Sequence, residues 1–152
     1  MTTRRARIAI LGSAEGWHVR DLFRAAAAES WEGPEVVVAP FDQVRSEIRA
    51  EAETVWSGNI NLSTCHGVLV RAMPAGSLEQ IIFRMDALHA LQRQGTVVVN
   101  SPRALETAID KYLTLSRLRT AGFLVPDTIV CQGAPEAIAA FETLGCDCVV
   151  KP

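Results

Sequence analysis

The chain has 152 residues, 49% of them hydrophobic and 21% charged, and a formal net charge of -2. These are globular values, and the length allows one ordinary domain with a sizeable core. The charge provides no basic surface for nucleic acid or for an anionic membrane. The apolar runs are only a few residues long, too short to span a bilayer. We therefore expect neither nucleic acid nor a membrane among its partners.

The first hundred residues alternate between strand and helix patterns. We predict strands at 7–11, 36–39, 67–71 and 96–99, and helices at 17–30, 41–53 and 77–94. Residues 54–64 carry no clear pattern. The strands are apolar throughout, which favours a parallel sheet covered on both faces. The fold class is therefore α/β, and Ser77 is the expected N-cap of the third helix.

The pattern changes after Asn100. Ser101 and Pro102 open a helix, and Asp110 can cap a further helix that reaches Ala121. We then predict a strand at 128–130, a helix at 135–144 and a final strand at 148–151. A domain boundary is expected near residues 100–105.

The four cysteines have one Cys-x-Cys spacing and no Cys-x-x-Cys spacing. No histidines at short spacing accompany them, so the sequence predicts no metal site. We interpret the cysteines as reduced, buried thiols of a cytoplasmic protein.

Two lysines are candidates for binding phosphate. Lys111 follows the predicted cap at Asp110, where free N–H groups and the helix dipole favour anions. For a lone lysine the simpler interpretation is an exposed residue on an amphipathic helix. Lys151 extends an apolar strand, where its charge is costly unless an anion or carboxylate meets it. The alternative is an edge position from which its side chain reaches water.

Arg71 is a third candidate, at the carboxyl end of the strand at 67–71. Ligands of parallel sheets gather beyond these ends. With the loop before Ser77 and the following helix N-terminus, Arg71 could bind a carboxylate with two parallel hydrogen bonds. A surface arginine that caps a loop carbonyl explains it equally well. The Gly12–Gly16 loop matches no phosphate-binding motif, and no catalytic triad is indicated.

Five segments between residues 71 and 152, in order, resemble the ATP-grasp ligases. They are Arg71–Gly76, Val97–Pro102 with V-N-S-P, Asp110–Gly122 with D-K and L-x-x-A-G, Val125–Thr128 with V-P-x-T, and Val149–Pro152 with V-V-K-P. The greatest similarity is to the RimK-type branch, which joins glutamate to a carboxylate acceptor. Within that branch, residues 71–80 resemble the pterin-cofactor glutamate ligases of tetrahydromethanopterin metabolism.

The resemblance implies a parallel-sheet pre-ATP-grasp domain at 1–103, followed at 104–152 by the incomplete start of an ATP-grasp domain. It implies that Lys111 and Lys151 contact the phosphates of ATP and that Arg71 binds part of the acceptor. The partners would be a small carboxylate acceptor and an amino acid, glutamate for this branch. A homo-oligomer is left open, because an exposed sheet of the first domain often forms the dimer face in such ligases.

The resemblance also implies parts that the 152 residues do not contain. The glycine-rich loop, the adenine pocket and the carboxylate and asparagine ligands of Mg²⁺ would follow Pro152. We therefore expect the chain to be the N-terminal portion of a longer ligase, inactive alone and at most a weak binder of ATP.

Two other hypotheses stay open on the sequence. One is a self-sufficient, non-catalytic α/β module that binds a small ligand or dimerises. The other is a ligase of the same superfamily with another substrate, such as a D-alanine–D-alanine or glutathione-synthetase type.

Overall fold

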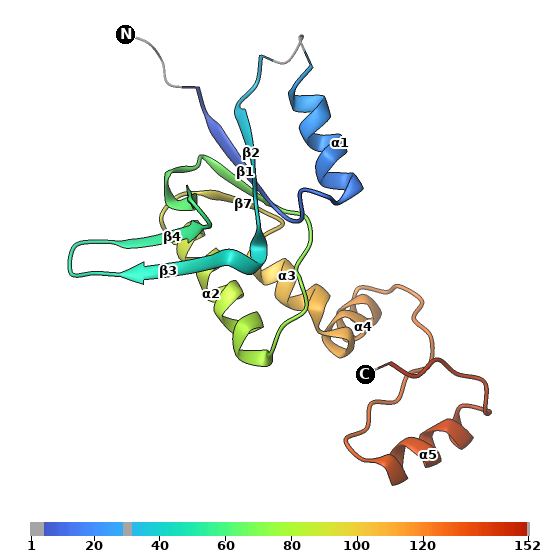
Figure 1. Ribbon diagram of the computed structural model, residues 1–152. Helices are drawn as coiled ribbons and strands as arrows, with labels where there is room; N and C mark the ends of the chain where they lie inside the picture. Colours follow the sequence, from blue (N-terminus) through green and yellow to red (C-terminus); the bar gives the residue numbers. More distant parts are fainter. Residues whose placement is uncertain (1–4, 29–31, 152) are drawn as a thin grey trace. The chain divides into compact units, whose positions relative to one another are not determined.

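The computed structural model describes residues 5–28 and 32–151. The chain divides into two compact units, Met1–Glu106 and Thr107–Pro152, which are described separately below. Figure 1 shows the helices and strands along the chain. Residues 29 and 30 of the predicted first helix, and Pro152 of the last motif, lie outside the described residues.

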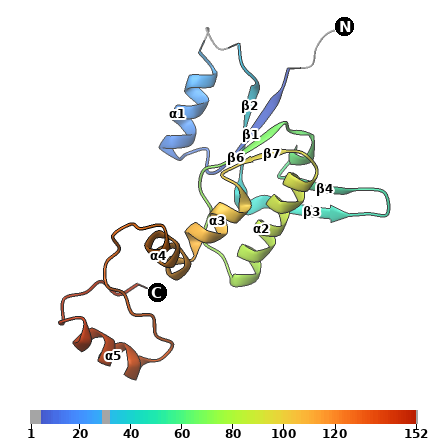
Figure 2. The same cartoon turned by 180° about the vertical axis from the view of Figure 1, so that it is seen from behind.

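Unit 1 is built on a four-stranded sheet, and this confirms the predicted α/β class (Figure 2). Its strands are β1 (Arg7–Leu11), β2 (Glu35–Ala39), β6 (Gly67–Val70) and β7 (Val97–Val99). Their order is β2-β1-β6-β7, and all neighbours are parallel. Central strands of a parallel sheet are buried on both faces, and β1 and β6 are accordingly apolar throughout except at Arg7.

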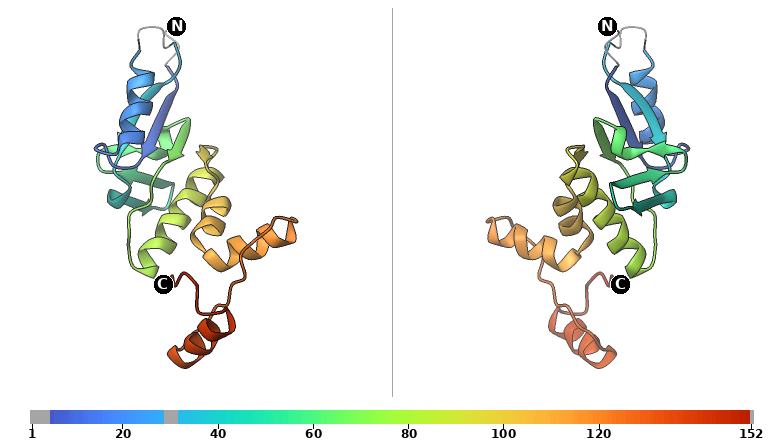
Figure 3. Two further views of the ribbon diagram at one scale, coloured as in Figure 1. Left: turned by 90° about the vertical axis from the view of Figure 1, so that its right-hand side faces the viewer. Right: turned by 90° about the vertical axis from the view of Figure 1, so that its left-hand side faces the viewer.

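Helices α1 (Trp17–Ala26) and α2 (Leu78–Arg93) connect these strands. The connection through α1 moves outward from β1 to β2, and the one through α2 moves outward from β6 to β7. Because such crossovers are right-handed, two that run in opposite directions place their helices on opposite faces. Figure 3 shows α1 alongside β1 and β2.

The main core lies on the α2 face of the sheet. The buried cluster comprises Ala9, Leu11, Ala39, Phe41, Val55, Leu62, Cys65, Val68, Val70, Met85, Ala87, Leu88, Ala90, Leu91 and Val98. Ile10 and Val19 are each 2% exposed outside this cluster, consistent with packing between the sheet and α1. On the α1 face, however, Val97 and Val99 of β7 are exposed, so the expected cover is incomplete there.

The prediction of a helix at 41–53 was wrong. Its residues form a short 3-10 turn, η1 (Phe41–Gln43), and then strand β3 (Val44–Ile48). β3 pairs antiparallel with β4 (Glu53–Ser57), which pairs with β5 (Ile60–Asn61), and a second turn, η2 (Leu62–Thr64), follows.

The charges of β3 explain this error. Arg45 and Arg49 both contact Glu47, which lies two residues from each. Side chains two residues apart share a face in a strand, whereas in a helix they diverge. Hydrogen bonds from the two guanidinium groups lower the pKa of Glu47 below its usual value, and the one from Arg45 has the larger effect. Arg45 also lies opposite Trp56 in β4, with its guanidinium 5.1 Å from the ring centroid.

The predicted helix caps at Ser77 and Asp110 formed. The Ser77 hydroxyl accepts the Gln80 N–H, and the Gln80 side chain accepts the Ser77 N–H at 3.0 Å, which completes a capping box. Asp110 Oδ1 accepts the Leu113 N–H at 2.9 Å. Helices α3 (Pro102–Ile109) and α4 (Lys111–Thr120) thus lie on either side of Asp110.

Unit 2 contains α4 and α5 (Ala134–Thr143), and neither predicted strand of this region forms. Residues 128–130 and 148–151 have no strand partner in the part of the chain that the structure describes. An apolar run becomes a strand only when a neighbour accepts and donates its backbone hydrogen bonds. Ala140 is the one buried residue among those described in this unit.

Candidate functional site

The ends of β1 and β6 form the place in unit 1 best suited to a ligand. These neighbouring strands send their connections in opposite directions, so a topological switch point lies at their carboxyl ends. Gly12 follows β1 and Arg71 follows β6. Open parallel sheets bind ligands in the crevice outside such a point.

Arg71 is anchored here through its backbone. Its N–H donates to the Leu11 carbonyl at 2.9 Å, and the next N–H, of Ala72, donates to the same oxygen at 3.4 Å. The Arg71 side chain is exposed. A fixed backbone with an exposed guanidinium suits bidentate binding of a carboxylate.

Gly12 allows the neighbouring elements to approach this point closely. A Cβ at Gly12 would lie 3.0 Å from Val19 Cγ2 on α1 and 3.7 Å from the Cβ of Arg71. The Gly12 N–H also donates to the Ala39 carbonyl at the end of β2, at 3.1 Å. Three strand ends therefore meet around a residue without a side chain.

The N-terminus of α2 already holds a carboxylate. The Ser77 hydroxyl donates to Glu79 Oε2 at 2.7 Å. This hydrogen bond, followed by that from Glu79's own backbone N–H, lowers the pKa of Glu79 below its usual value. The N-terminus of α2 was expected to help bind a substrate carboxylate. It cannot do so while the carboxylate of Glu79 occupies it.

Arg84 of α2 was missed by the sequence analysis. Its side chain is 6% exposed, and its Nη1 donates to the Pro74 carbonyl at 2.7 Å. The sequence did contain a signal for it. Arg84 lies between Ile81 and Leu88 on the apolar stripe of the helix, where a charged side chain is rare unless a specific contact compensates its burial.

Lys111 and Lys151 both belong to unit 2. Lys111 is the first residue of α4, directly after the cap at Asp110, and is exposed. Lys151 is exposed in an extended stretch, and the preceding Val149 and Val150 are 81% and 86% exposed. The strand predicted at 148–151 does not form, so Lys151 is not buried as expected. The phosphate-binding roles of Lys111 and Lys151 stay predictions.

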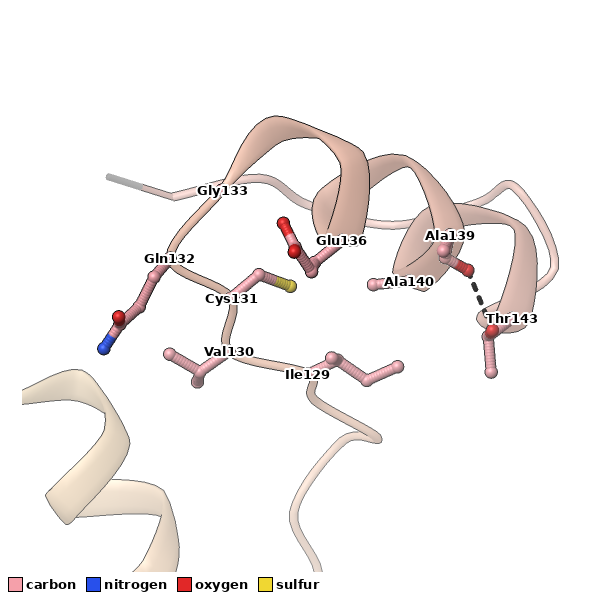
Figure 4. Close-up of a pocket in the computed structure, with 9 residues that line it drawn as sticks. All are labelled: Ile129, Val130, Cys131, Gln132, Gly133, Glu136, Ala139, Ala140 and Thr143. Atoms are coloured by element: carbon pink, nitrogen blue, oxygen red, sulfur yellow. Dashed lines mark hydrogen bonds between the residues drawn. The ribbon is translucent and has the colours of Figure 1, made fainter.

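A hollow of about 680 Å³ in unit 2 lies between α5 and the segment before it (Figure 4). It is lined by Ile129, Val130, Cys131, Gln132, Gly133, Glu136, Ala139, Ala140 and Thr143. Neither lysine lines it, and Glu136 contributes a carboxylate that would repel phosphate. This hollow is therefore unsuited to the triphosphate of ATP.

The cysteines differ in exposure. Cys65 is buried, Cys131 is half-buried, and Cys146 and Cys148 are exposed, so the interpretation as four buried thiols was wrong. All four are free. Among the described residues, no three His, Cys, Asp or Glu side chains gather as metal ligands. None of the helices described has the length and apolar content needed to cross a bilayer.

Comparison with solved structures shows which fold this chain shares. The chain is similar to an ATP-grasp ligase, PsnB, complexed with a minimal precursor, with a TM-score of 0.58 and 23% identity over 91% of this chain and 50% of that one. The same ligase with Mg and ADP and a phosphomimetic precursor variant gives a TM-score of 0.57, at 22% identity over 93% and 52%. The chain therefore has the fold of part of an ATP-grasp ligase.

A particular relative is more similar in sequence, and together with these structures it confirms the resemblance found in the sequence. The tetrahydromethanopterin:alpha-L-glutamate ligase of Methanosarcina acetivorans is 34% identical over 140 residues, which cover 91% of this chain and 43% of that protein. The chain thus spans about half the length of the relatives it matches. No protein-family signature matches it.

Proposed function

We propose that the chain forms the N-terminal part of an ATP-dependent, RimK-type carboxylate–amine ligase that joins glutamate to a carboxylate acceptor. The 34% identity to a glutamate ligase over 140 residues carries this proposal. The exposed Arg71 at the switch point supports it, because the site has the chemistry that a carboxylate acceptor needs.

In this reaction, the γ-phosphoryl group of ATP passes to the acceptor carboxylate, which gives an acyl phosphate and ADP. The amine of glutamate then attacks the acyl carbon, phosphate leaves, and the nitrogen loses a proton. Lys111 and Lys151 would contact the phosphates and offset their charge, and Arg71 would hold the acceptor. The ligands of Mg²⁺ would belong to other parts of the ligase, as the family resemblance implies.

We propose that residues 1–103 are the pre-ATP-grasp domain and residues 104–152 the start of the ATP-grasp domain. Unit 2 supports this division, because it exposes apolar residues that a complete domain would bury. Examples are Phe123 at 64%, Leu124 at 103% and Val150 at 86% exposure. The free thiols support a reducing, cytoplasmic setting.

A chimera tests the proposal. The matching segment of the Methanosarcina ligase is replaced by this chain, and ATP-dependent attachment of glutamate to the pterin acceptor is measured together with ADP release. We expect activity in the chimera and none in the 152-residue chain alone. Arg71→Gln should raise the KM for the acceptor, whereas Arg93→Gln, a change on the exposed surface of α2, should not.

The lysines give the second arm of this test, because Lys111 and Lys151 are the two lysines of the sequence. Acetylation of each is followed by mass spectrometry of the chimera with and without ATP. We expect ATP to slow the modification of both. A folded chimera that releases no ADP, or in which ATP protects neither lysine, would contradict the proposal and favour a non-catalytic module.

A further inference from the structure

Arg84 is a buried cation that pairs with no carboxylate of the described part of the chain. Its side chain is 6% exposed, and the ion pairs of the described residues do not include it. Burying a charge is costly unless specific contacts compensate it. The contacts that Arg84 does make therefore indicate what it is for.

Two contacts connect Arg84 to the loops at the carboxyl edge of the sheet. Its Nη1 donates to the Pro74 carbonyl at 2.7 Å, in the loop after β6. Its guanidinium lies 5.9 Å from the ring centroid of Phe41, in the turn after β2. Phe41 is 2% exposed, so this cation–π contact forms out of water, where it is strongest.

Gly76 fits against the same guanidinium. A Cβ at Gly76 would lie 2.9 Å from Arg84 Nη1 and 2.8 Å from Gln80 Oε1. Gln80 Oε1 in turn accepts the Ser77 N–H of the capping box at 3.0 Å. Arg84 and Gln80 therefore hold the end of the loop against α2, and the absence of a side chain at Gly76 makes this contact possible.

The loop that Arg84 holds is the one that begins at Arg71. At its start, the backbone of Arg71 is bonded to Leu11, and at its end Ser77 is bonded to Gln80. Between these ends, Arg84 of α2 donates a side-chain hydrogen bond to the Pro74 carbonyl, and Met73 packs against the core. Loss of the hydrogen bond from Arg84 would release residues 74–76 from α2, while Met73 stays packed against the core, and the hydrogen bonds at the two ends of the loop would then open more often.

We propose that Arg84 is a positioning residue of the acceptor site, which fixes the 71–77 loop and so the direction in which Arg71 meets a carboxylate. This inference rests on the proposed function for the role of Arg71. A charged donor is required, because a hydrogen bond from a charged group is stronger than a neutral one. Preorganisation of a binding side chain reduces the entropy lost when the ligand binds.

Amide hydrogen exchange in the 152-residue chain tests the positioning role by itself. The variants are Arg84→Met, which keeps an apolar stem without charge, and Arg84→Lys, which keeps a charged donor. The matched control is Arg93→Met, an exposed arginine of the same helix. Arg84→Met should speed exchange of the Arg71, Ala72 and Ser77 amides by tenfold or more, with the strand amides of β1 and β6 changed far less.

The conservative Arg84→Lys should restore most of this protection, and Arg93→Met should leave it unchanged. An Arg84→Met chain whose loop exchanges as slowly as the unaltered one would overturn the proposal. Equal loosening of loop and strands would also do so, because it would mean that Arg84 merely stabilises the unit.

Ligand binding supplies the functional readout, with glutarate as the carboxylate probe and the Arg71 and Ala72 amide signals as reporters. Arg84→Met should weaken binding by about tenfold, as expected for loss of a charged hydrogen bond. Arg84→Lys should bind nearly as well as the unaltered chain, and Arg71→Gln should not bind. Equal affinity of Arg84→Met and the unaltered chain would overturn the proposal. Failure of the unaltered chain to bind glutarate would count against the acceptor role of Arg71, and the exchange rates would still decide the role of Arg84.

Discussion

At the scale of single residues, the switch point depends on how little space Gly12 takes. Its neighbours are Val19 of α1 and Arg71 after β6. A Cβ at position 12 would lie 3.0 Å from Cγ2 of Val19. Val19 is buried, so it has little room to move. A side chain at position 12 would therefore push α1 away from the sheet and disturb the backbone near Arg71.

We expect Gly12→Val to lower the free energy of unfolding by roughly 1–3 kcal/mol, the usual cost of overpacking. Urea denaturation measures this loss. The control is Ala14→Val in the same loop, where the side chain is exposed and the change should be within about 0.5 kcal/mol. Equal effects of the two changes would contradict the role of Gly12.

The thiols should react in the order of their exposure. Burial raises the pKa of Cys65, so less of its reactive thiolate is present, and access is blocked as well. We expect iodoacetamide at pH 8 to modify Cys146 and Cys148 first and Cys65 last, as measured by mass spectrometry. In urea the four rates should converge. Fast reaction of Cys65 in the folded chain would be contrary to the structure.

The residues that the sequence predicts well are those with local partners. Ser77 and Asp110 cap helices through the N–H groups of residues three positions ahead, so the pattern is visible in the sequence. Arg84 depends on Pro74 and Phe41, which are 10 and 43 positions away, and no local pattern reveals them. Arg71, Lys111 and Lys151 are candidates because of their positions in the predicted elements, and the family resemblance implies their particular roles, which still await their tests.

At the scale of elements, periodicity explains both success and error. The strands of the parallel sheet are short apolar runs between turn residues, and α2 repeats its apolar residues at helical spacing. The segment 44–48 mixes charged and apolar residues, which suits an exposed helix as well as a hairpin strand. Pairing with β4, which the periodicity of residues 44–48 alone does not show, decides in favour of the strand.

The first turn of α2 provides a test at this scale. Ser77→Ala removes the cap and should cost about 1 kcal/mol in the free energy of unfolding. It should also raise the pKa of Glu79, because the hydroxyl that lowers it is lost. NMR titration of the Glu79 carboxyl measures the shift, with the pKa of Glu47 as an internal control that should not change. An unchanged pKa of Glu79 would contradict the hydrogen bond from the Ser77 hydroxyl to its carboxylate.

The pH dependence follows from the direction of this shift. The folded pKa of Glu79 lies below the unfolded one, so its contribution is fully present above the unfolded pKa. It is lost as the pH falls through the folded pKa. The difference in stability between the unaltered chain and Ser77→Ala should therefore be greater at neutral pH than in acid.

At the scale of the whole molecule, the two units differ in how they are stabilised. Unit 1 has a continuous buried cluster, whereas Ala140 is the one buried residue described in unit 2. Apolar burial is the main favourable term in folding, at roughly 25 cal/mol per Å². The helices of unit 2 are each 10 residues long, which is marginal without packing.

We therefore expect the amides of α4 and α5 to exchange much faster than those of α2. Limited proteolysis should cut unit 2 first, near the fully exposed Leu124, and leave a fragment with unit 1 intact. Mass spectrometry identifies the fragments. In the chimera the same amides should become protected. Equal protection of α4, α5 and α2 in the 152-residue chain would contradict this view.

The edge position of β7 has a consequence for handling the protein. β7 pairs with β6 along one side and is the last strand of its sheet, and it consists of three valines. With Val97 and Val99 exposed, it is a template on which another copy can add a strand. Concentrated samples should therefore aggregate through this edge, and a lysine in place of Val97 should improve solubility with little loss of stability.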